Sequence, residues 1–328
     1  MTRPRVGVVG TGHWGRNLAR NFHQLGALGA LCDVDVERLL ATAARYPLAR
    51  TYEHIDVLLD DSQVDAVVIA TPSSTHGALA RQVLNTEKPV FVEKPLCLDL
   101  REAGELKQMV RAKRLLLMVG HLLLYHPAFV ALKEFIRSGR LGELRYVYSH
   151  RLNFREVRGD DDALWDFAPH DLSMLLSLVG ELPAYVTTSG GSSVDPPIPE
   201  TTLSHLSFSS GLHAHVFVSW VHPHKDQRLV IVGEEGMVIF DDVLPAPNKL
   251  RFYPHEVNWH DGVPAISRDD ALPIPYQDAE PLAVECAHFL DCITNDRLPL
   301  SNIDEAMDVL AVLDACQRSM QSSQPVTI

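Results

Sequence analysis

The sequence predicts an α/β protein of two domains: a doubly wound parallel sheet, followed by an α+β domain with a large, open, mostly antiparallel sheet. Three observations support this prediction. Short apolar runs alternate with helical patterns of about ten to fifteen residues through the first third of the chain. A glycine-rich turn at residues 10–15 (Gly-Thr-Gly-His-Trp-Gly) follows the first apolar run. After about Leu122 the pattern changes, and through residues 184–252 the apolar residues recur at every second position.

In the first half, the apolar runs have the valine-rich character of strands buried in a sheet. Strands are predicted at residues 5–10, 65–71, 89–94 and 115–120, and in a run that ends at residue 33. Helices are predicted between them at residues 13–26, 35–46, 75–84 and 99–113. Alternation of this kind gives βαβ units, and therefore a parallel sheet.

The second half begins with a helix, a strand and a second helix, at residues 127–138, 143–152 and 169–179. Strands with period-two alternation then fill residues 184–252, with glycines at the turns between them. Two helices, at residues 279–294 and 302–321, end the series. We place the domains at residues 1–122 and 123–328, with the C-terminal helix able to pack back on the first domain.

The composition indicates a soluble globular protein rather than one that binds polyanions. The chain carries 42 acidic and 29 basic residues, a net charge of −13, which disfavours binding to nucleic acid or anionic membranes. It is 46% hydrophobic, yet no apolar run reaches the roughly 18 residues that span a bilayer. The first strand begins near Arg5, which leaves no room for a signal peptide, so we expect a cytoplasmic protein. Buried, reduced thiols are expected at Cys32, Cys97, Cys286, Cys292 and Cys316.

The glycine-rich turn has the context of a dinucleotide-binding motif, because it follows a strand and opens a helix. The small residues allow the backbone to approach a pyrophosphate, which the helix N-terminus then binds. Asp33 follows Gly15 by 18 residues, at the end of the second strand. A carboxylate there binds the adenosine ribose and favours NAD over NADP, although the nearby Arg38 leaves NADP open. The alternative is a glycine turn of another α/β protein, with Asp33 as a helix N-cap.

Two further segments follow strands of the same sheet, and so lie at the edge where parallel sheets bind ligands. Residues 71–76 (Thr-Pro-Ser-Ser-Thr-His) are interpreted as lining the nicotinamide half of the crevice, or else as a simple turn and N-cap. Glu93-Lys94-Pro95 ends the next strand. The predicted cofactor-binding residues are Gly10, Gly12, His13, Trp14, Gly15, Asp33, Thr71, Pro72, His76, Glu93 and Lys94.

Lys94 also leads the predicted catalytic residues, because a partly desolvated ammonium favours the alkoxide of a substrate hydroxyl. Its expected partners lie in residues 165–171 (Trp-Asp-Phe-Ala-Pro-His-Asp). Pro169 is predicted as the first residue of a helix, which places His170 in the first turn and Asp166 just before it. A carboxylate beside an imidazole is a typical general-base arrangement. The alternatives are a surface lysine and a buried structural histidine.

These motifs, with Gly120-His121, resemble those of the Gfo/Idh/MocA family along essentially the whole chain. The resemblance implies a Rossmann domain and an α/β domain whose open sheet makes a subunit interface in a homodimer or homotetramer. It also implies that Lys94, Asp166 and His170 are the catalytic set, and that the bond before Pro95 is often cis in relatives. A sugar hydroxyl would then lie between Lys94 and His170, while hydride moves to NAD. Which of the two is the formal base stays open, because their titrations would be coupled.

Residues 151–171 resemble the branch of the family that acts on the C3 hydroxyl of nucleotide-linked amino sugars, before a PLP aminotransferase adds an amine. UDP-N-acetylglucosamine, used for lipid A or other surface glycans, is the favoured substrate, and UDP-N-acetylglucosaminuronate is the alternative. The expected substrate-binding residues are Arg151, Asn153, Arg158, Trp165 and His121. Arg155 is a further candidate for the diphosphate, although any single arginine here could instead belong to an exposed strand. Two rivals remain: a free-sugar or inositol dehydrogenase, and a non-catalytic NAD-binding sensor.

Paired histidines in the second half suggest a metal site only weakly. His213 and His215 lie two apart on a predicted strand, and His222 and His224 flank a proline. No carboxylate or cysteine joins them at recognisable spacing, so we assign no metal and interpret them as structural. Trp220 and Lys225 are likewise assigned to sheet packing or an interface.

Overall fold

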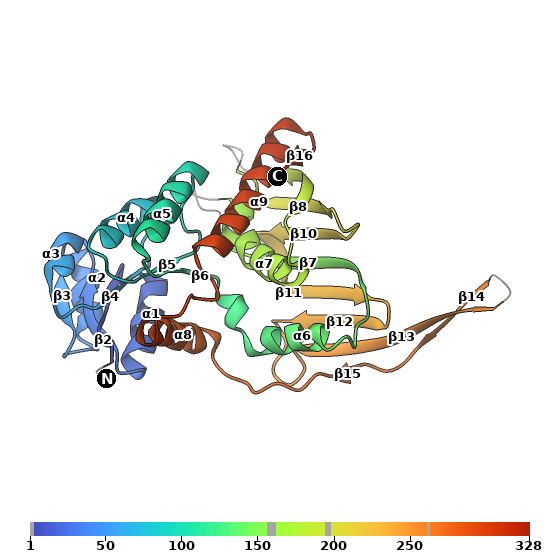
Figure 1. The fold of residues 1–328 in the computed structure, drawn as a ribbon, viewed down its shortest axis with the longest axis horizontal. Coiled ribbons are helices and arrows are strands. Elements are labelled where there is room, and N and C mark those ends of the chain that lie inside the picture. Colours follow the sequence, from blue (N-terminus) through green and yellow to red (C-terminus); the bar gives the residue numbers. More distant parts are fainter. Residues whose placement is uncertain (1–2, 156–161, 194–197, 261–262) are drawn as a thin grey trace. The chain divides into compact units, whose positions relative to one another are not determined.

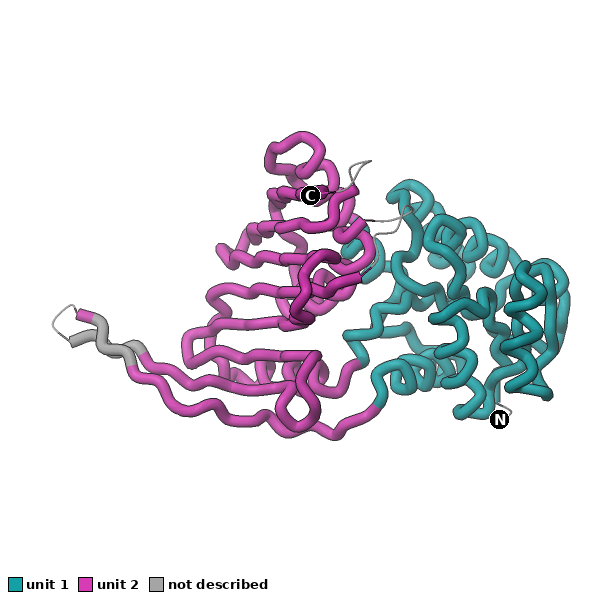
Figure 2. Tube along the Cα trace, turned by 180° about the vertical axis from the view of Figure 1, so that it is seen from behind, with its two compact units in different colours: residues 1–125, 280–310 teal, residues 126–279, 311–328 magenta. Residues whose placement is uncertain are grey.

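The computed structural model describes residues 3–155, 162–193, 198–260 and 263–328 (Figure 1). The chain forms two compact units, each described by itself (Figure 2). The first contains residues 1–125 and 280–310, and the second contains residues 126–279 and 311–328. Residues 280–310 thus belong with the N-terminal part of the chain rather than with the second domain in which the sequence division placed them.

The first unit is built on a parallel sheet of six strands in the order β3-β2-β1-β4-β5-β6. The strands are β1 (Val6–Val9), β2 (Leu28–Cys32), β3 (Arg50–Tyr52), β4 (Ala66–Ile69), β5 (Val90–Glu93) and β6 (Leu117–Gly120). The predicted doubly wound parallel sheet is confirmed. The strand order reverses between β1 and β4, and ligands bind beside such a switch point, at the carboxyl ends of the strands.

Helices cover both faces of this sheet, with α1 and α8 against one face and α4 and α5 against the other (Figure 1). The helices and 3-10 turns of the unit are α1 (His13–Gln24), α2 (Val36–Ala43), α3 (Ile55–Asp60), η1 (Ser73–Thr75), α4 (His76–Asn85), α5 (Leu100–Lys113), η2 (Leu122–Tyr125), α8 (Pro281–Asn295) and the start of α9 (Ile303–Ser322). Aromatic packing explains why α8 returns to this unit. Phe289 lies 6.4 Å from Phe22 of α1 and 5.7 Å from Phe91 of β5, measured between ring centroids.

The second unit contains a ten-stranded sheet in the order β14-β13-β12-β11-β7-β10-β9-β8-β16, with β15 paired to β13. Its strands are β7 (Leu144–Phe154), β8 (Pro183–Gly191), β9 (Thr201–Phe208), β10 (His213–Ser219), β11 (Val221–Gly233), β12 (Gly236–Asp241), β13 (Leu250–His260), β14 (Val263–Arg268), β15 (Leu272–Pro273) and β16 (Val326–Thr327). The pairings are antiparallel except that β7 and β10 run parallel, so the predicted mostly antiparallel sheet is confirmed.

The helices α6 (Pro127–Arg137) and α7 (Ala163–Val179) pack on this sheet. Alternate residues of the central strands, such as Val147 and Val216, are buried on the face that α7 contacts. The opposite face, which we call the open face, carries half-buried or exposed side chains: Tyr146, Tyr148, His150, Tyr185, Leu203, His205, His213, His215 and Phe217.

The predicted start of the helix at Pro169 was wrong. Helix α7 begins at Ala163, where Asp162 caps it by accepting a hydrogen bond from the backbone of Trp165, and Pro169 lies inside the helix. The sequence interpretation weighted the preference of proline for a first turn above the aspartate cap. The correction matters, because Asp166 and His170 now lie four residues apart on one helix.

No helix in the part of the chain that the structure describes is long and apolar enough to cross a membrane. All five cysteines are buried free thiols, as expected.

Candidate active site

The glycine-rich turn joins β1 to α1 and packs tightly against its neighbours. A Cβ on Gly15 would lie 1.8 Å from the carbonyl oxygen of Gly10, and a Cβ on Gly10 would lie 2.6 Å from that of Ala70. A Cβ on Gly12 would meet no atom of the described residues within 4 Å. The turn therefore leaves no room for a side chain at Gly10 or Gly15, whereas the space beside Gly12 is open among the described residues.

The N-terminus of α1 fits the pyrophosphate of NAD. Gly12 is the N-cap and offers no side-chain cap, and the first turn contains no acidic residue within the described chain. The first N–H groups of a helix lack intrahelical partners and carry a partial positive charge, which binds phosphate oxygens. His13, predicted to contact the cofactor, is exposed at the first position of this helix.

Two glycine variants should separate ligand binding from packing. We expect Gly12→Ala to keep the melting temperature and to weaken NAD binding, because the added methyl enters the open space at the helix N-terminus. We expect Gly15→Ala to lower the melting temperature by several degrees, because overpacking costs about 1–3 kcal/mol. Calorimetry of binding and thermal unfolding measure the two effects. A Gly12→Ala protein with unaltered NAD affinity would contradict the assignment of this turn.

Asp33 anchors the turn from the end of β2. Its Oδ2 accepts hydrogen bonds from the backbone N–H and the hydroxyl of Thr11, at 2.7 and 2.9 Å, and its side chain is nearly buried. The N-cap of α2 is Asp35, so the alternative interpretation of Asp33 as that cap was wrong. The half-exposed Arg38 lies 3.9 Å from Asp33.

Glu93 connects the glycine turn to Lys94. The indole N–H of Trp14 donates to Oε1 of Glu93, and the backbone N–H of Lys94 donates to Oε2 at 3.2 Å. Burial raises the pKa of the Glu93 carboxyl to about 7, although the bond from Trp14 opposes the shift. Lys94 is half-buried at the end of β5 and precedes Pro95 through a cis peptide bond.

His76 braces the loops that follow β4 and β5. Its side chain is 1% exposed, and its ring nitrogens lie 2.8 Å from the carbonyl oxygen of Thr71 and 2.7 Å from that of Pro95. Burial lowers the pKa of this imidazole. Sequence reasoning expected His76 to face the cofactor, but the structure engages both nitrogens with backbone. His76 thus supports the segment that carries Lys94, whereas Thr71 and Pro72 lie in the loop itself.

Some residues predicted to bind substrate have structural partners instead. Nδ1 of His121 lies 2.5 Å from Oε2 of Glu305 in the first unit, and His121 is 2% exposed. In the second unit, Arg151 is 6% exposed and donates to Asp171 at 2.6 Å. We therefore leave His121 and Arg151 out of the substrate contacts proposed below.

The other substrate candidates differ in their exposure. The indole of Trp165 is largely buried and donates to Gln317 at 2.8 Å. Asn153 is half-buried near the end of β7, and its side-chain oxygen accepts the N–H of Phe154. Arg158 lies outside the described residues.

Helix α7 of the second unit carries both of the predicted catalytic residues of that unit, the carboxylate Asp166 and the imidazole His170. Residues four apart on a helix share one face, so Asp166 and His170 are neighbours there. Oδ2 of Asp166 accepts hydrogen bonds from Arg155 at 2.6 Å and from the indole N–H of Trp220 at 3.1 Å. Sequence reasoning assigned Arg155 to a diphosphate and Trp220 to packing. A buried indole needs an acceptor for its N–H, and this was the signal available for Trp220.

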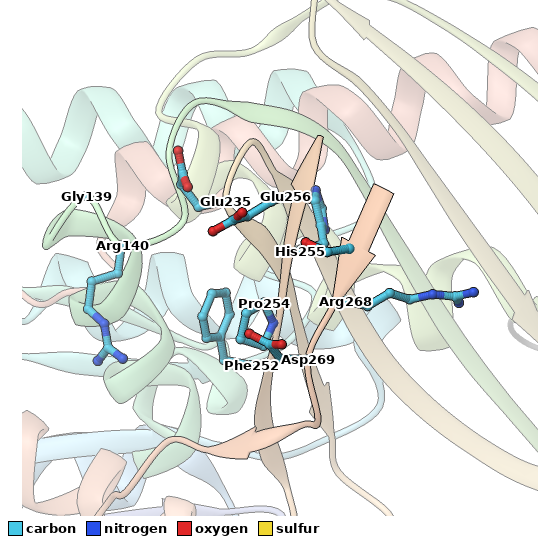
Figure 3. A pocket seen from close by; sticks show the side chains of 10 residues that line it. Gly139, Arg140, Glu235, Phe252, Pro254, His255, Glu256, Arg268 and Asp269 are labelled. Atoms are coloured by element: carbon cyan, nitrogen blue, oxygen red, sulfur yellow. The ribbon is translucent and has the colours of Figure 1, made fainter. Parts of the chain in front are cut away.

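The paired histidines do not form a metal centre in the described part of the chain, where no group of three potential ligands is suitably placed. His213 and His215 lie on the open face of the sheet, where His213 stacks on His205 with 5.3 Å between centroids. The second unit also contains a hollow of about 400 Å³ near the end of α6 and the β13–β14 pair (Figure 3). Its lining mixes both charges, as in Arg140, Glu235, Arg268 and Asp269, and contains none of the predicted site residues within the described chain.

A dinucleotide-binding sheet with a lysine at the end of β5, in a chain that also carries an Asp–His pair on one helix, is the organisation of a nicotinamide-dependent dehydrogenase. Residues 4–121 match the model of the oxidoreductase family with an NAD-binding Rossmann fold, Gfo/Idh/MocA, and residues 129–239 match the C-terminal domain of the same family. The chain belongs to the Gfo/Idh/MocA family. The predictions of an NAD cofactor and of an NAD-dependent enzyme are confirmed.

The comparisons also identify individual relatives. The chain is 31% identical over 298 residues to a UDP-N-acetylglucosamine 3-dehydrogenase of Acidithiobacillus ferrooxidans, covering 90% of this chain and 91% of the relative. A solved structure of UDP-N-acetylglucosamine 3-dehydrogenase from that organism superposes with a TM-score of 0.85 at 28% identity, over 98% of this chain and 99% of the other. An inositol 2-dehydrogenase of Rhizobium meliloti is 26% identical over 350 aligned positions, covering 99% of each chain.

Proposed function

We propose that this protein oxidises the C3 hydroxyl of UDP-N-acetylglucosamine to the 3-ketone with NAD. The observation that supports this substrate most is the 31% identity to a UDP-N-acetylglucosamine 3-dehydrogenase over 90% of the chain. Lys94 and the Asp166–His170 pair supply the groups that oxidation of an alcohol needs. The 3-ketone is the substrate of a PLP aminotransferase, so we place the protein in the biosynthesis of lipid A or another surface glycan.

Each residue has a separate role in this proposal. NAD, when bound, supplies the hydride acceptor, and the glycine turn with Asp33 holds its pyrophosphate and adenosine ribose. Lys94 stabilises the negative charge that develops on the substrate oxygen, and His170 receives the hydroxyl proton. Asp166 orients His170, and Arg155 and Trp220 hold the Asp166 carboxylate in place. In this proposal Lys94 and His170 act on the same proton, so either can be the formal base.

Asn153 and Arg158 remain as proposed substrate contacts. Asn153 is half-buried near the end of β7, the strand that precedes helix α7, and its side-chain amide can donate to a sugar or a phosphate oxygen. Arg158 follows in the same segment of the sequence and offers a bidentate donor for the diphosphate.

The absorbance of reduced nicotinamide tests the proposal directly. Purified protein is mixed with NAD and UDP-N-acetylglucosamine, and an aminotransferase removes the unfavourable ketone. A signal in this arm supports the substrate, the cofactor and the reaction together. Parallel arms contain UDP-N-acetylglucosaminuronate, myo-inositol or NADP. Turnover in the uronate arm alone would move the protein to a different nucleotide sugar while keeping the mechanism.

Inositol oxidation is the second candidate, supported by the 26% identity to an inositol 2-dehydrogenase over 99% of both chains. It predicts turnover with free inositol and no benefit from a nucleotide. NAD binding without turnover of any sugar would favour a sensor. The presence of Lys94, Asp166 and His170 argues against this last outcome, since a sensor has no need of them.

We further propose that a second copy of the chain covers the open face in a homodimer or homotetramer. The face has large half-exposed groups, including Tyr146 and Tyr185 at 43% and Leu203 at 46%. Leu203→Glu should weaken this assembly, since a charge would be desolvated at the interface. Light scattering measures the mass. Leu298→Glu, at an 82% exposed site of the first unit, is the control, and two variants of equal mass would contradict the assignment of this face.

A further inference from the structure

A buried carboxyl group lies directly before the lysine, and none of the roles proposed above uses it. Glu93 is the last residue of β5 and is 8% exposed. Burial of an ionised carboxylate is unfavourable unless hydrogen bonds or nearby charges compensate it. The sequence interpretation assigned this side chain to cofactor binding. The contacts that compensate its burial point to a different role.

Both oxygens of the Glu93 carboxyl group are engaged within the first unit. The indole N–H of Trp14 donates to Oε1, and the backbone N–H of Lys94 donates to Oε2 at 3.2 Å. Gly120 lies opposite Glu93 on the neighbouring strand β6, and a Cβ on this glycine would lie 2.7 Å from Oε2. The carboxyl group therefore lies close to the backbone of β6, with one oxygen directed at each donor.

The segment that carries the lysine is held on both sides by side chains of helices. Trp14 is the second residue of α1, the helix whose N-terminus fits the pyrophosphate. On the other side of the lysine, a ring nitrogen of His76 from α4 lies 2.7 Å from the carbonyl oxygen of Pro95. The helices α1 and α4 follow β1 and β4, the two strands at the switch point of the sheet. The residues on either side of Lys94 are thus tied to the edge of the sheet where ligands bind.

We propose that Glu93 and Trp14 are positioning residues for Lys94 rather than ligands of the cofactor. The Glu93 carboxylate ties the start of the lysine segment to the first turn of α1, which keeps the lysine in a fixed relation to the pyrophosphate-binding end of that helix. A carboxylate offers two acceptor oxygens, one for each N–H donor, whereas the amide of glutamine offers one. The inference rests on the proposed function through the chemical role of Lys94.

Steady-state kinetics and calorimetry with NAD at pH 8 separate positioning from cofactor binding. At this pH Glu93 is mostly ionised, since burial raises its pKa to about 7. Trp14→Phe removes the N–H donor and keeps an aromatic ring. We expect kcat to fall about ten- to a hundredfold, the effect of a small misplacement of a reacting group, with the Kd of NAD within about twofold of wild type. Weaker NAD binding with an unchanged kcat is the result expected of a cofactor ligand, and it would overturn the proposal.

Two further variants disturb the same carboxyl group independently. Glu93→Gln loses one acceptor, and Gly120→Ala places a methyl group against Oε2 of Glu93. Both should lower kcat as Trp14→Phe does. The double variant Trp14→Phe, Glu93→Gln should be little worse than either single variant, because both changes remove one contact; fully additive losses would contradict this. Glu105→Gln, at a 60% exposed carboxylate of the same unit, is the matched control and should keep the wild-type kcat.

The reactivity of the Lys94 amine gives a readout that needs no substrate. Reductive methylation with formaldehyde, followed by mass spectrometry of the peptides, measures the rate at each lysine. Loss of the Glu93 contact should loosen the lysine segment, so the Lys94 amine should react severalfold faster in Trp14→Phe and in Glu93→Gln than in wild type. The exposed Lys113 is the internal reference and should react equally in all three proteins. Equal rates at Lys94 in the three proteins would overturn the proposal.

This inference and the proposed function can fail separately. Faster labelling of Lys94 in the variants, with no sugar turned over by the wild-type protein, would keep the positioning role and reject the proposed function. Turnover by wild type, with labelling and kcat unchanged in the variants, would do the reverse. If the variants do not fold, hydrogen exchange of the wild-type protein decides. The backbone N–H of Lys94 donates to Glu93 and must be protected, and exchange as fast as in an unstructured chain overturns the proposal.

Discussion

Replacement of Lys94 by alanine is expected to lower kcat about a thousandfold, the effect of losing one positioned donor or proton-transfer group. The lysine lies half-buried at the end of β5, and in the proposed function its ammonium stabilises the developing alkoxide. NAD binding should persist, because Gly12 and Asp33 lie on other loops of the sheet. Steady-state kinetics with UDP-N-acetylglucosamine and calorimetry with NAD measure the two properties separately.

Two controls make the Lys94 result specific. Lys113→Ala removes a largely exposed ammonium of the same unit and should leave kcat unchanged. Lys94→Arg keeps the charge but changes its geometry, so it should recover only part of the loss. Activity of Lys94→Ala within a few-fold of wild type would mean that the lysine has no chemical role.

Replacement of His170 by asparagine is expected to lower kcat by about 10²–10⁴-fold, the range for loss of a positioned general base. Asparagine retains hydrogen-bonding groups but cannot accept the hydroxyl proton. The helix should tolerate the change, because His170 lies within α7 and is only half-buried. Rapid-mixing kinetics with saturating NAD measure the proton-dependent step without interference from product release.

An exposed histidine outside the proposed site supplies the comparison for His170. His224→Asn changes an exposed position of β11 and should leave kcat as it is. The double variant Lys94→Ala, His170→Asn should be little worse than either single variant, because the two groups act on one proton. Fully additive losses would show that they act in separate steps.

The secondary structure was largely predictable, and the misses have physical causes. The buried strands β1, β4 and β5 have continuous apolar runs, and these identified the parallel sheet. Strand β3 was missed because Arg50–Tyr52 is short, polar and largely exposed, so no apolar pattern marks it. The start of α7 was misplaced because Pro169 resembles a helix start, whereas the actual cap is Asp162.

The residues of the candidate site also fall into two groups: those that the sequence identifies and those that only tertiary contacts reveal. The glycine turn, Asp33, Lys94 and His170 are recognisable because local chemistry marks them: a tight turn, a strand end or a motif. His76, Arg155 and Trp220 act through contacts with segments that are distant in sequence or through carbonyl groups, and no local pattern reports these.

Local composition and spacing were enough to identify the family, the alternation of most strands and helices in residues 1–122, and the residue types available for dehydrogenase chemistry. Which side chains remain available to a ligand depends instead on tertiary packing. His76, His121 and Arg151 are buried and hydrogen-bonded to other protein groups, which occupies the atoms that a ligand would contact. The Asp166 carboxylate accepts hydrogen bonds from Arg155 and Trp220. Tertiary packing also returned α8 to the first unit. The physical reason is that burial and partner choice are set by packing between segments far apart in the chain, and the ionisation of a carboxyl follows from that packing.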